Sequence, residues 1–200
     1  MTGVQTCALP IFIVDAQIDF IRGSLAVKGA EEAIQNLVKY IRGYGKEYHT
    51  IIVTKDWHIK NHPSFKEYGG IWPEHCVEYS FGAELPNSLE YAIRWADCVT
   101  TTIKKGNTEE AYSAFEEIDN GVKNLLSNSD EIHVCGIAGD YCVKESIKDL
   151  LKHGYNNISV IKECIASIDE KEFEKFLNEK NILGINEVKR TFHGKINFGH

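Results

Sequence analysis

Three residues suited to nucleophilic chemistry are far apart in this chain, yet each stands at the end of an apolar run typical of a buried β-strand: Asp15, Lys105 and Cys142. Parallel α/β sheets gather their strand ends along one edge, where ligands bind, so we expect the three side chains to share a pocket. A thiol nucleophile, a carboxylate that takes its proton and a charge-balancing ammonium group are what acyl transfer from an amide needs. The sequence therefore predicts an enzyme.

Each of these residues could instead have a purely structural role. Cys142 would then be a buried cysteine that packs a helix start, Asp15 a turn cap and Lys105 a solvated lysine. The chemical interpretation of Cys142 depends on its position three residues after Gly139, in the first turn of a predicted helix that follows a strand. There the unpaired N–H groups and the helix dipole are expected to lower the pKa of the thiol and to hold an oxyanion.

A second group of residues predicts a metal site. Asp56 and His58 alternate by two positions, so in an extended segment their side chains leave the same face. If His75 folds back across the loop, two histidines and one carboxylate leave open positions for water or substrate, as in catalytic Zn²⁺ sites, and Fe²⁺ or Mn²⁺ would also accept these ligands. His62 would then lie near the metal, although Pro63 argues against a continuous helix. The alternative is a set of loop histidines that bind nothing.

The composition excludes several classes of partner. The chain has 200 residues, 43% of them apolar, which suffices for one domain with a full core. A net charge of −7 gives no basic footprint for nucleic acid, and no Lys/Arg run suggests a membrane surface, so we expect a small-molecule partner. No apolar stretch approaches the roughly 20 residues of a spanning helix and no signal peptide opens the chain, so we expect a cytoplasmic location.

The cysteines argue for a reducing compartment. Six cysteines are spread along the chain without C-x-x-C pairs, which is not the pattern of a disulfide framework. Apart from Cys142, we interpret most of them as small buried hydrophobic residues, namely Cys7, Cys98, Cys135 and Cys164.

Strand and helix patterns alternate along the chain and predict an α/β fold. The predicted strands lie at 11–14, 50–54, 98–103, 132–137 and 158–161, with a short sixth strand within 182–188. The predicted helices lie at 30–41, 88–95, 122–126 and 143–151, and around 173–177. Residues 55–88 form a long, aromatic-rich loop region of the functional kind. We expect three α/β/α layers around a mostly parallel, Rossmann-like sheet of about six strands.

The chain ends are expected to lie outside this fold. We predict a single domain at 10–189, preceded by a disordered or non-native leader at 1–9 and followed by a C-terminal tail at 190–200. The leader shows neither helical nor strand periodicity, and a proline such as Pro10 is disfavoured inside a central strand.

Six short strings occur in the order seen in the isochorismatase-like cysteine hydrolases: IVDAQIDF, GSLAVKGA, TKDWHIKNHPSF, WPEHC, KKGNTEEAYSAF and GIAGDYCV. The chain resembles the nicotinamidases most, from about residue 11 to about residue 188. The resemblance implies hydrolysis of nicotinamide to nicotinate and ammonia through a thioester, a role in NAD salvage, and a homo-oligomer. A related amidase for pyrazinamide or a carbamoyl or ureido compound, a metal-free isochorismatase and a binding protein without turnover stay open as alternatives.

The resemblance also assigns roles to individual residues. Asp15 matches the proton-handling carboxylate, Lys105 its cationic partner and Cys142 the nucleophile. The matched metal ligands are Asp56, His58 and His75; His62 is expected near the metal from its spacing alone, four residues after His58. The matched substrate-binding residues are Phe20 and Trp72, which sandwich the pyridine ring, together with Tyr112 and Ile137.

The family pattern further implies a cis peptide bond between Ile137 and Ala138, which turns the N–H groups of Ala138 and Cys142 toward the oxyanion. Two positions depart from this pattern. Ile18 stands where the family usually has Asn, and Gly139 where Thr is usual. Both are expected to touch the pocket wall, so the substrate is less well determined than the reaction class.

Overall fold

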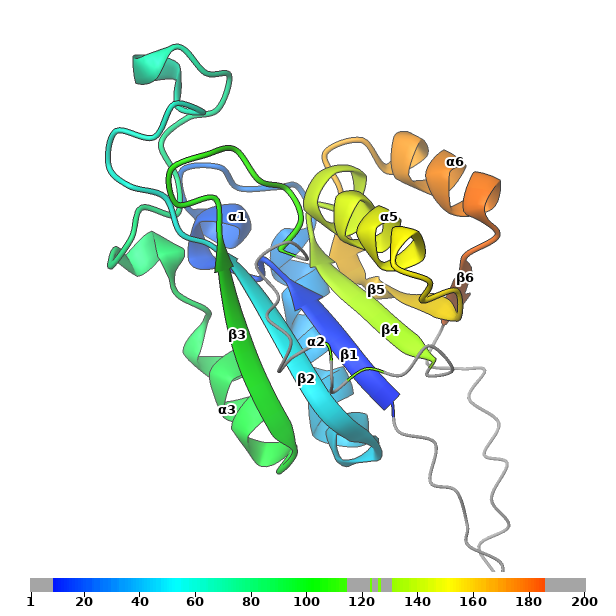
Figure 1. Cartoon of the computed structure of the whole chain (residues 1–200). Coiled ribbons are helices and arrows are strands. Elements are labelled where there is room, and N and C mark those ends of the chain that lie inside the picture. Colours follow the sequence, from blue (N-terminus) through cyan, green and yellow to red (C-terminus); the bar gives the residue numbers. More distant parts are fainter. Residues whose placement is uncertain (1–8, 115–122, 124–125, 127–130, 186–200) are drawn as a thin grey trace, which may run out of the picture.

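The computed structural model describes residues 9–114, 123, 126 and 131–185 (Figure 1). The predicted tail at 190–200, nearly all of the predicted leader, including Cys7, and most of the predicted helix at 122–126 lie outside these residues. The parts that position the predicted chemistry are all described.

A parallel sheet forms the centre of the molecule (Figure 1). Its strands are β1 (Leu9–Val14), β2 (Tyr48–Asp56), β3 (Val99–Lys105), β4 (Ile132–Ile137), β5 (Ile158–Ala166) and β6 (Leu183–Ile185). The sheet has six strands in the order β3-β2-β1-β4-β5-β6, and every neighbouring pair is parallel. The predicted α/β class with a parallel sheet is confirmed.

Helices cover both faces of the sheet. They are α1 (Ile18–Arg22), α2 (Ala30–Tyr44), α3 (Asn87–Trp95), α5 (Lys144–Lys152) and α6 (Glu170–Lys180). Strand side chains alternate between the two faces: Ile11 and Ile13 of β1 belong to the same core as α2 and α3, whereas Phe12 and Val14 belong to the core of α5 and α6. This alternation produces the expected three layers. In the described part of the chain, no helix has both the length and the apolar character that crossing a bilayer requires.

The first strand begins earlier than predicted. β1 starts at Leu9 rather than Ile11 and includes Pro10. The register with β2 is irregular between Leu9 and Pro10, and pairing with β4 begins only at Ile11. The missing N–H of Pro10 therefore falls at the start of the strand, where a proline is tolerated.

Two short features escaped the sequence patterns. The helix α1 has only five residues, too few to show a helical period. Cys142 lies in a π-helical turn, Gly139–Val143, which leads into α5. Both features lie next to strand ends at the carboxyl edge of the sheet and carry residues that surround the candidate site.

Candidate active site

The carboxyl ends of four neighbouring strands, β3, β2, β1 and β4, bring the predicted catalytic residues together, with Cys142 in the turn that follows β4. Asp15 follows β1 directly, and Lys105 is the last residue of β3, where it pairs with Asp56 at the end of β2. Lys105 Nζ lies 2.9 Å from Asp15 Oδ2 and 3.6 Å from Cys142 Sγ. It also donates a hydrogen bond to Asp56 Oδ1. Two carboxylates and a thiol from distant parts of the chain thus meet around the ammonium group of Lys105.

The buried charges in this cluster stabilise one another. Burial lowers the pKa of Lys105, but the carboxylates of Asp15 and Asp56 outweigh it and hold the pKa of Lys105 well above its ordinary value. For Asp56, burial raises the pKa, but Lys105, His58 and His75 outweigh burial and leave the pKa well below its usual range. The lysine therefore stays charged, and Asp56 stays ionised beside it.

Asp15 behaves differently from Asp56. Its side chain is fully buried, and burial raises its pKa despite the opposing charge of Lys105. Thr54 Oγ1 donates a hydrogen bond to Asp15 Oδ1 at 2.7 Å, which fixes the orientation of the carboxyl group. A carboxyl group with a raised pKa can accept a proton and return it, as general acid–base catalysis requires.

The thiol of Cys142 is not acidic, contrary to the expectation from its helix position. Burial raises the pKa of Cys142 well above its ordinary value; Lys105 lowers it in part, and Asp15 and Asp56 raise it further. Only 6% of Cys142 is exposed, and the loss of hydration outweighs the favourable charge of Lys105. The thiol therefore needs a neighbouring base. A carboxylate oxygen of Asp15 and the sulfur of Cys142 lie within 4.8 Å of each other.

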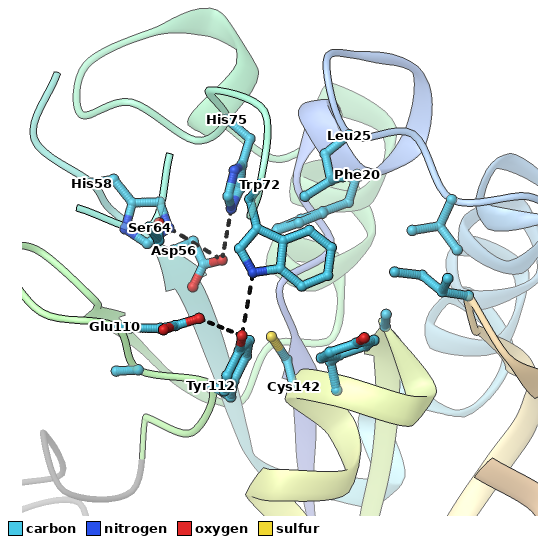
Figure 2. A pocket seen from close by; sticks show the side chains of 15 residues that line it. Phe20, Leu25, Asp56, His58, Ser64, Trp72, His75, Glu110, Tyr112 and Cys142 are labelled. Atoms are coloured by element: carbon cyan, nitrogen blue, oxygen red, sulfur yellow. Dashed lines mark hydrogen bonds and ion pairs between the residues drawn. The ribbon is translucent and has the colours of Figure 1, made fainter. Parts of the chain in front are cut away.

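Asp56, His58 and His75 form a candidate metal site beside this cluster (Figure 2). Asp56 Oδ2 lies 3.5 Å from His58 Nε2 and 3.8 Å from His75 Nε2. His58 Nδ1 donates to the Gly106 carbonyl and His75 Nδ1 donates to the Pro73 carbonyl at 2.8 Å, so both Nε2 lone pairs face Asp56. Backbone hydrogen bonds of this kind orient metal-binding histidines. The donor set fits a divalent cation.

A cavity opens above the thiol and the metal ligands (Figure 2). Its empty volume is about 490 Å³, open solvent at the mouth included. The residues that line it are Phe20, Leu25, Val27, Asp56, His58, Ser64, Trp72, His75, Glu110, Ala111, Tyr112, Ala138, Tyr141, Cys142 and Ile168. The cavity is therefore aromatic and apolar on one side and rich in metal-binding groups on the other.

Four predicted site residues do not line the cavity. They are Asp15 and Lys105, which lie in the charged cluster beneath it, and His62 and Ile137. The His62 ring lies beside that of His58, with 4.3 Å between centroids. Ile137 is fully buried, and its peptide bond to Ala138 is cis, as the resemblance implies. Ala138 itself lines the cavity next to Cys142.

The two departures from the family pattern do not touch the cavity either, contrary to expectation. Ile18 is buried, and its N–H donates to the Glu84 carbonyl at 2.9 Å. A Cβ atom at Gly139 would lie 2.2 Å from Ser167 Oγ and 2.9 Å from Phe173 Cδ1. The space that a larger residue would need at position 139 is therefore already filled.

Two residues that support the site were missed by sequence reasoning. Gln17 is fully buried and holds both backbone groups of Asp56: its Nε2 donates to Asp56 O at 2.7 Å and its Oε1 accepts from Asp56 N at 2.8 Å. Asp140 accepts from the N–H groups of Ile168 at 2.9 Å and Asp169 at 2.8 Å. Both residues stand in the quoted strings IVDAQIDF and GIAGDYCV, which was the only signal for them.

Comparisons with known proteins agree with this geometry. The family model of the isochorismatase domain matches residues 10–184. The nicotinamidase/pyrazinamidase of Mycobacterium tuberculosis is 34% identical over 153 residues, which cover 72% of this chain and 79% of that protein. This chain belongs to the isochorismatase family.

Two solved structures have the same architecture. The pyrazinamidase of Pyrococcus horikoshii in complex with zinc is 33% identical, with a TM-score of 0.72 over 89% of this chain and 98% of that chain. The structure of PnC1 from L. infantum in complex with nicotinate is 29% identical, with a TM-score of 0.76 over 94% of this chain and 96% of that chain.

Proposed function

We propose that this protein hydrolyses nicotinamide to nicotinate and ammonia, with Cys142 as nucleophile, Asp15 as general acid and base, and Lys105 as the balancing cation. The observation that carries the proposal is the contact of these three groups beneath an aromatic cavity, where Lys105 Nζ lies 2.9 Å from Asp15 Oδ2 and 3.6 Å from Cys142 Sγ. The names of the relatives, a nicotinamidase/pyrazinamidase and a protein bound to nicotinate, support this choice of substrate.

In the first step, Asp15 accepts the thiol proton as the sulfur of Cys142 attacks the carboxamide carbon. Because the pKa of the free thiol is raised, this proton transfer has to accompany the attack. The N–H groups of Ala138 and Cys142 would hold the oxyanion of the tetrahedral intermediate. One such donor typically contributes about 3 kcal/mol to transition-state stabilisation.

In the second step, Asp15 gives its proton to the leaving nitrogen, the C–N bond breaks, and ammonia departs from a thioester on Cys142. Water then attacks the thioester carbon and loses a proton to Asp15. The C–S bond breaks, nicotinate is released, and the proton returns to the sulfur. Throughout these steps Lys105 offsets the negative charge that passes between carboxylate and sulfur.

The residues Asp56, His58 and His75 would hold one divalent metal ion, for which we propose Zn²⁺. The same donors accept Fe²⁺ or Mn²⁺. When bound, such an ion supplies a Lewis acid for the pyridine nitrogen. We also infer that His62 lies close to the metal, since its Nε2 is buried and has no hydrogen-bond partner among the described residues.

The aromatic side of the cavity would bind the ring of the substrate. Phe20 and Trp72 are proposed to sandwich the pyridine ring, with Tyr112 as part of the wall and Ile137 acting through its peptide bond to Ala138. We also infer a cytoplasmic role in NAD salvage and a homo-oligomeric state, both of which follow from the composition and the resemblance.

Ammonia release from nicotinamide, measured with and without added metal, tests the proposal. We expect turnover by the unmodified protein and a loss of about 10³-fold or more in Cys142→Ala, because a covalent nucleophile is removed. Cys98→Ala is the matched control, since Cys98 lies outside the cavity, directly before β3. Ordinary turnover of nicotinamide by Cys142→Ala would refute the mechanism. The same assay with pyrazinamide and with a ureido compound tests the alternative substrates.

A further inference from the structure

A chain of hydrogen bonds runs along one wall of the cavity and ends at a carboxylate (Figure 2). Trp72 Nε1 donates to Tyr112 OH at 3.2 Å, and Tyr112 OH donates to Glu110 Oε1. All three side chains line the cavity. Trp72 belongs to the long loop between β2 and α3, whereas Glu110 and Tyr112 follow β3. The chain therefore ties two separate loops together.

Glu110 determines the direction of these hydrogen bonds. A carboxylate only accepts, so the hydroxyl proton of Tyr112 points to Glu110 and the phenol oxygen is left to accept from the indole N–H of Trp72. Burial and the hydrogen bond to Glu110 raise the pKa of Tyr112 to about 12, so the phenol keeps this proton at neutral pH. Without Glu110, the Tyr112 hydroxyl has no fixed orientation.

The same segment is also anchored to the catalytic cluster. The carbonyl of Ala111, between Glu110 and Tyr112, accepts a hydrogen bond from Lys105 Nζ at 3.0 Å. The Tyr141 ring packs against the Trp72 ring at 5.2 Å and the Tyr112 ring at 5.7 Å between centroids. Three aromatic rings thus form one continuous wall, which we call the aromatic wall: Trp72, Tyr112 and Tyr141.

We propose that Glu110 is a positioning residue that determines substrate size: it holds the aromatic wall closed over Cys142 and so restricts the cavity to small amides. The Trp72 N–H and the Tyr112 hydroxyl are both used in the hydrogen bonds that end at Glu110, so at these two positions the wall offers ring faces to a substrate. A substituent on the substrate ring meets side chains that cannot easily separate. The choice of nicotinamide as the reference substrate rests on the proposed function.

A steady-state comparison of nicotinamide with 5-methylnicotinamide, which adds one methyl group, tests this role. In Glu110→Ala we expect KM for nicotinamide to rise about 3- to 10-fold, the effect of one hydrogen bond of ordinary strength, with kcat changed less than about 2-fold. The preference for nicotinamide over the methylated amide should fall by a similar factor. Glu110→Gln, which keeps an oxygen acceptor for the Tyr112 hydroxyl, should recover most of the loss.

The matched control is Glu109→Ala, which removes the same charge one residue earlier. Glu109 is exposed and does not line the cavity, so KM and the preference should stay as in the unmodified protein. A purely structural role of Glu110 would lower the melting temperature without moving KM or the preference. That result would overturn the inference.

A second measurement needs no turnover of an amide. Iodoacetamide alkylation of Cys142 in the full chain with added Zn²⁺, followed by peptide mass spectrometry, reports how closed the wall is. We expect several-fold faster alkylation in Glu110→Ala and in Tyr112→Phe, and no further increase in the double variant, because both changes open the same contact.

The two measurements separate this inference from the proposed function. If the unmodified protein releases no ammonia from nicotinamide, the proposed function fails, and the alkylation rates still decide whether Glu110 closes the wall. If nicotinamide is hydrolysed but Glu110→Ala leaves KM, the preference and the alkylation rate unchanged, the role of Glu110 is refuted while the proposed function stands.

Discussion

Replacing Lys105 with methionine tests the electrostatic centre of the site. The side chains of Lys105 and Asp15 are both 0% exposed, and their charged atoms lie 2.9 Å apart. Lys105→Met keeps much of the side-chain volume but leaves Asp15 and Asp56 facing each other without a cation. Breaking a buried ion pair in this way costs about 3–5 kcal/mol. We expect the free energy of unfolding in urea to fall by that amount at pH 8.

The loss should depend on pH in a defined direction. Without Lys105, both buried carboxylates have pKa values raised above those of the unfolded chain, so the folded state binds protons that the unfolded state releases. Stability of the variant therefore rises as the pH falls, and the deficit against the unmodified protein should be smaller at pH 5 than at pH 8.

A second substitution provides the control for Lys105→Met. Asp15→Asn added to Lys105→Met removes one of the two unbalanced charges and should restore part of the lost stability. The reasoning is refuted if Lys105→Met unfolds within about 1 kcal/mol of the unmodified protein at both pH values, because the carboxylates would then not depend on the lysine.

Three further substitutions test the surroundings of the site. His75→Ala should abolish stoichiometric binding of a divalent ion, measured by elemental analysis of dialysed protein, because two ligands remain of three. Gln17→Leu leaves both backbone groups of Asp56 unpaired and should lower the free energy of unfolding by about 1–3 kcal/mol per group, measured in urea. Gly139→Thr should cost roughly 1–3 kcal/mol through its clash with Ser167, measured by thermal unfolding, and Ser167→Ala should recover part of it.

Each of these predictions has a control substitution or a result that would contradict it. His153→Ala, at the far end of α5, should leave the metal content unchanged. Gln35→Leu, at an exposed position of α2, should leave stability within about 0.5 kcal/mol. Metal retained by His75→Ala, or equal stability of Gly139→Thr with and without Ser167→Ala, would contradict the described contacts.

The sequence was sufficient to predict the sheet and the meeting of distant residues. Apolar, β-branched runs such as 132–137 are buried on both faces and mark the strands of a parallel sheet. Asp15 and Asp56 stand at the ends of such runs, and Lys105 ends the largely exposed edge strand β3, so the geometry of the sheet places all three at one edge.

The features that the sequence did not predict arise from tertiary contacts. The pKa of Cys142 depends on how much protein covers the thiol, and a helix start read from sequence contains no such information. Ile18 and Gly139 were expected at the cavity. Both lie in short helical turns, and packing in the folded protein decides which side of such a turn faces the cavity. Glu110 gains its place only because two loops from different parts of the chain meet in space.

The most direct test of the central claim is to look for the covalent intermediate. The unmodified protein is mixed with nicotinamide, quenched in acid within a single turnover, digested and analysed by mass spectrometry. We predict a nicotinoyl group on the peptide that contains Cys142, and none in Asp15→Asn, in which the thiol has no base. A nicotinoyl group on a different cysteine, or turnover without any acylated peptide, would contradict the account.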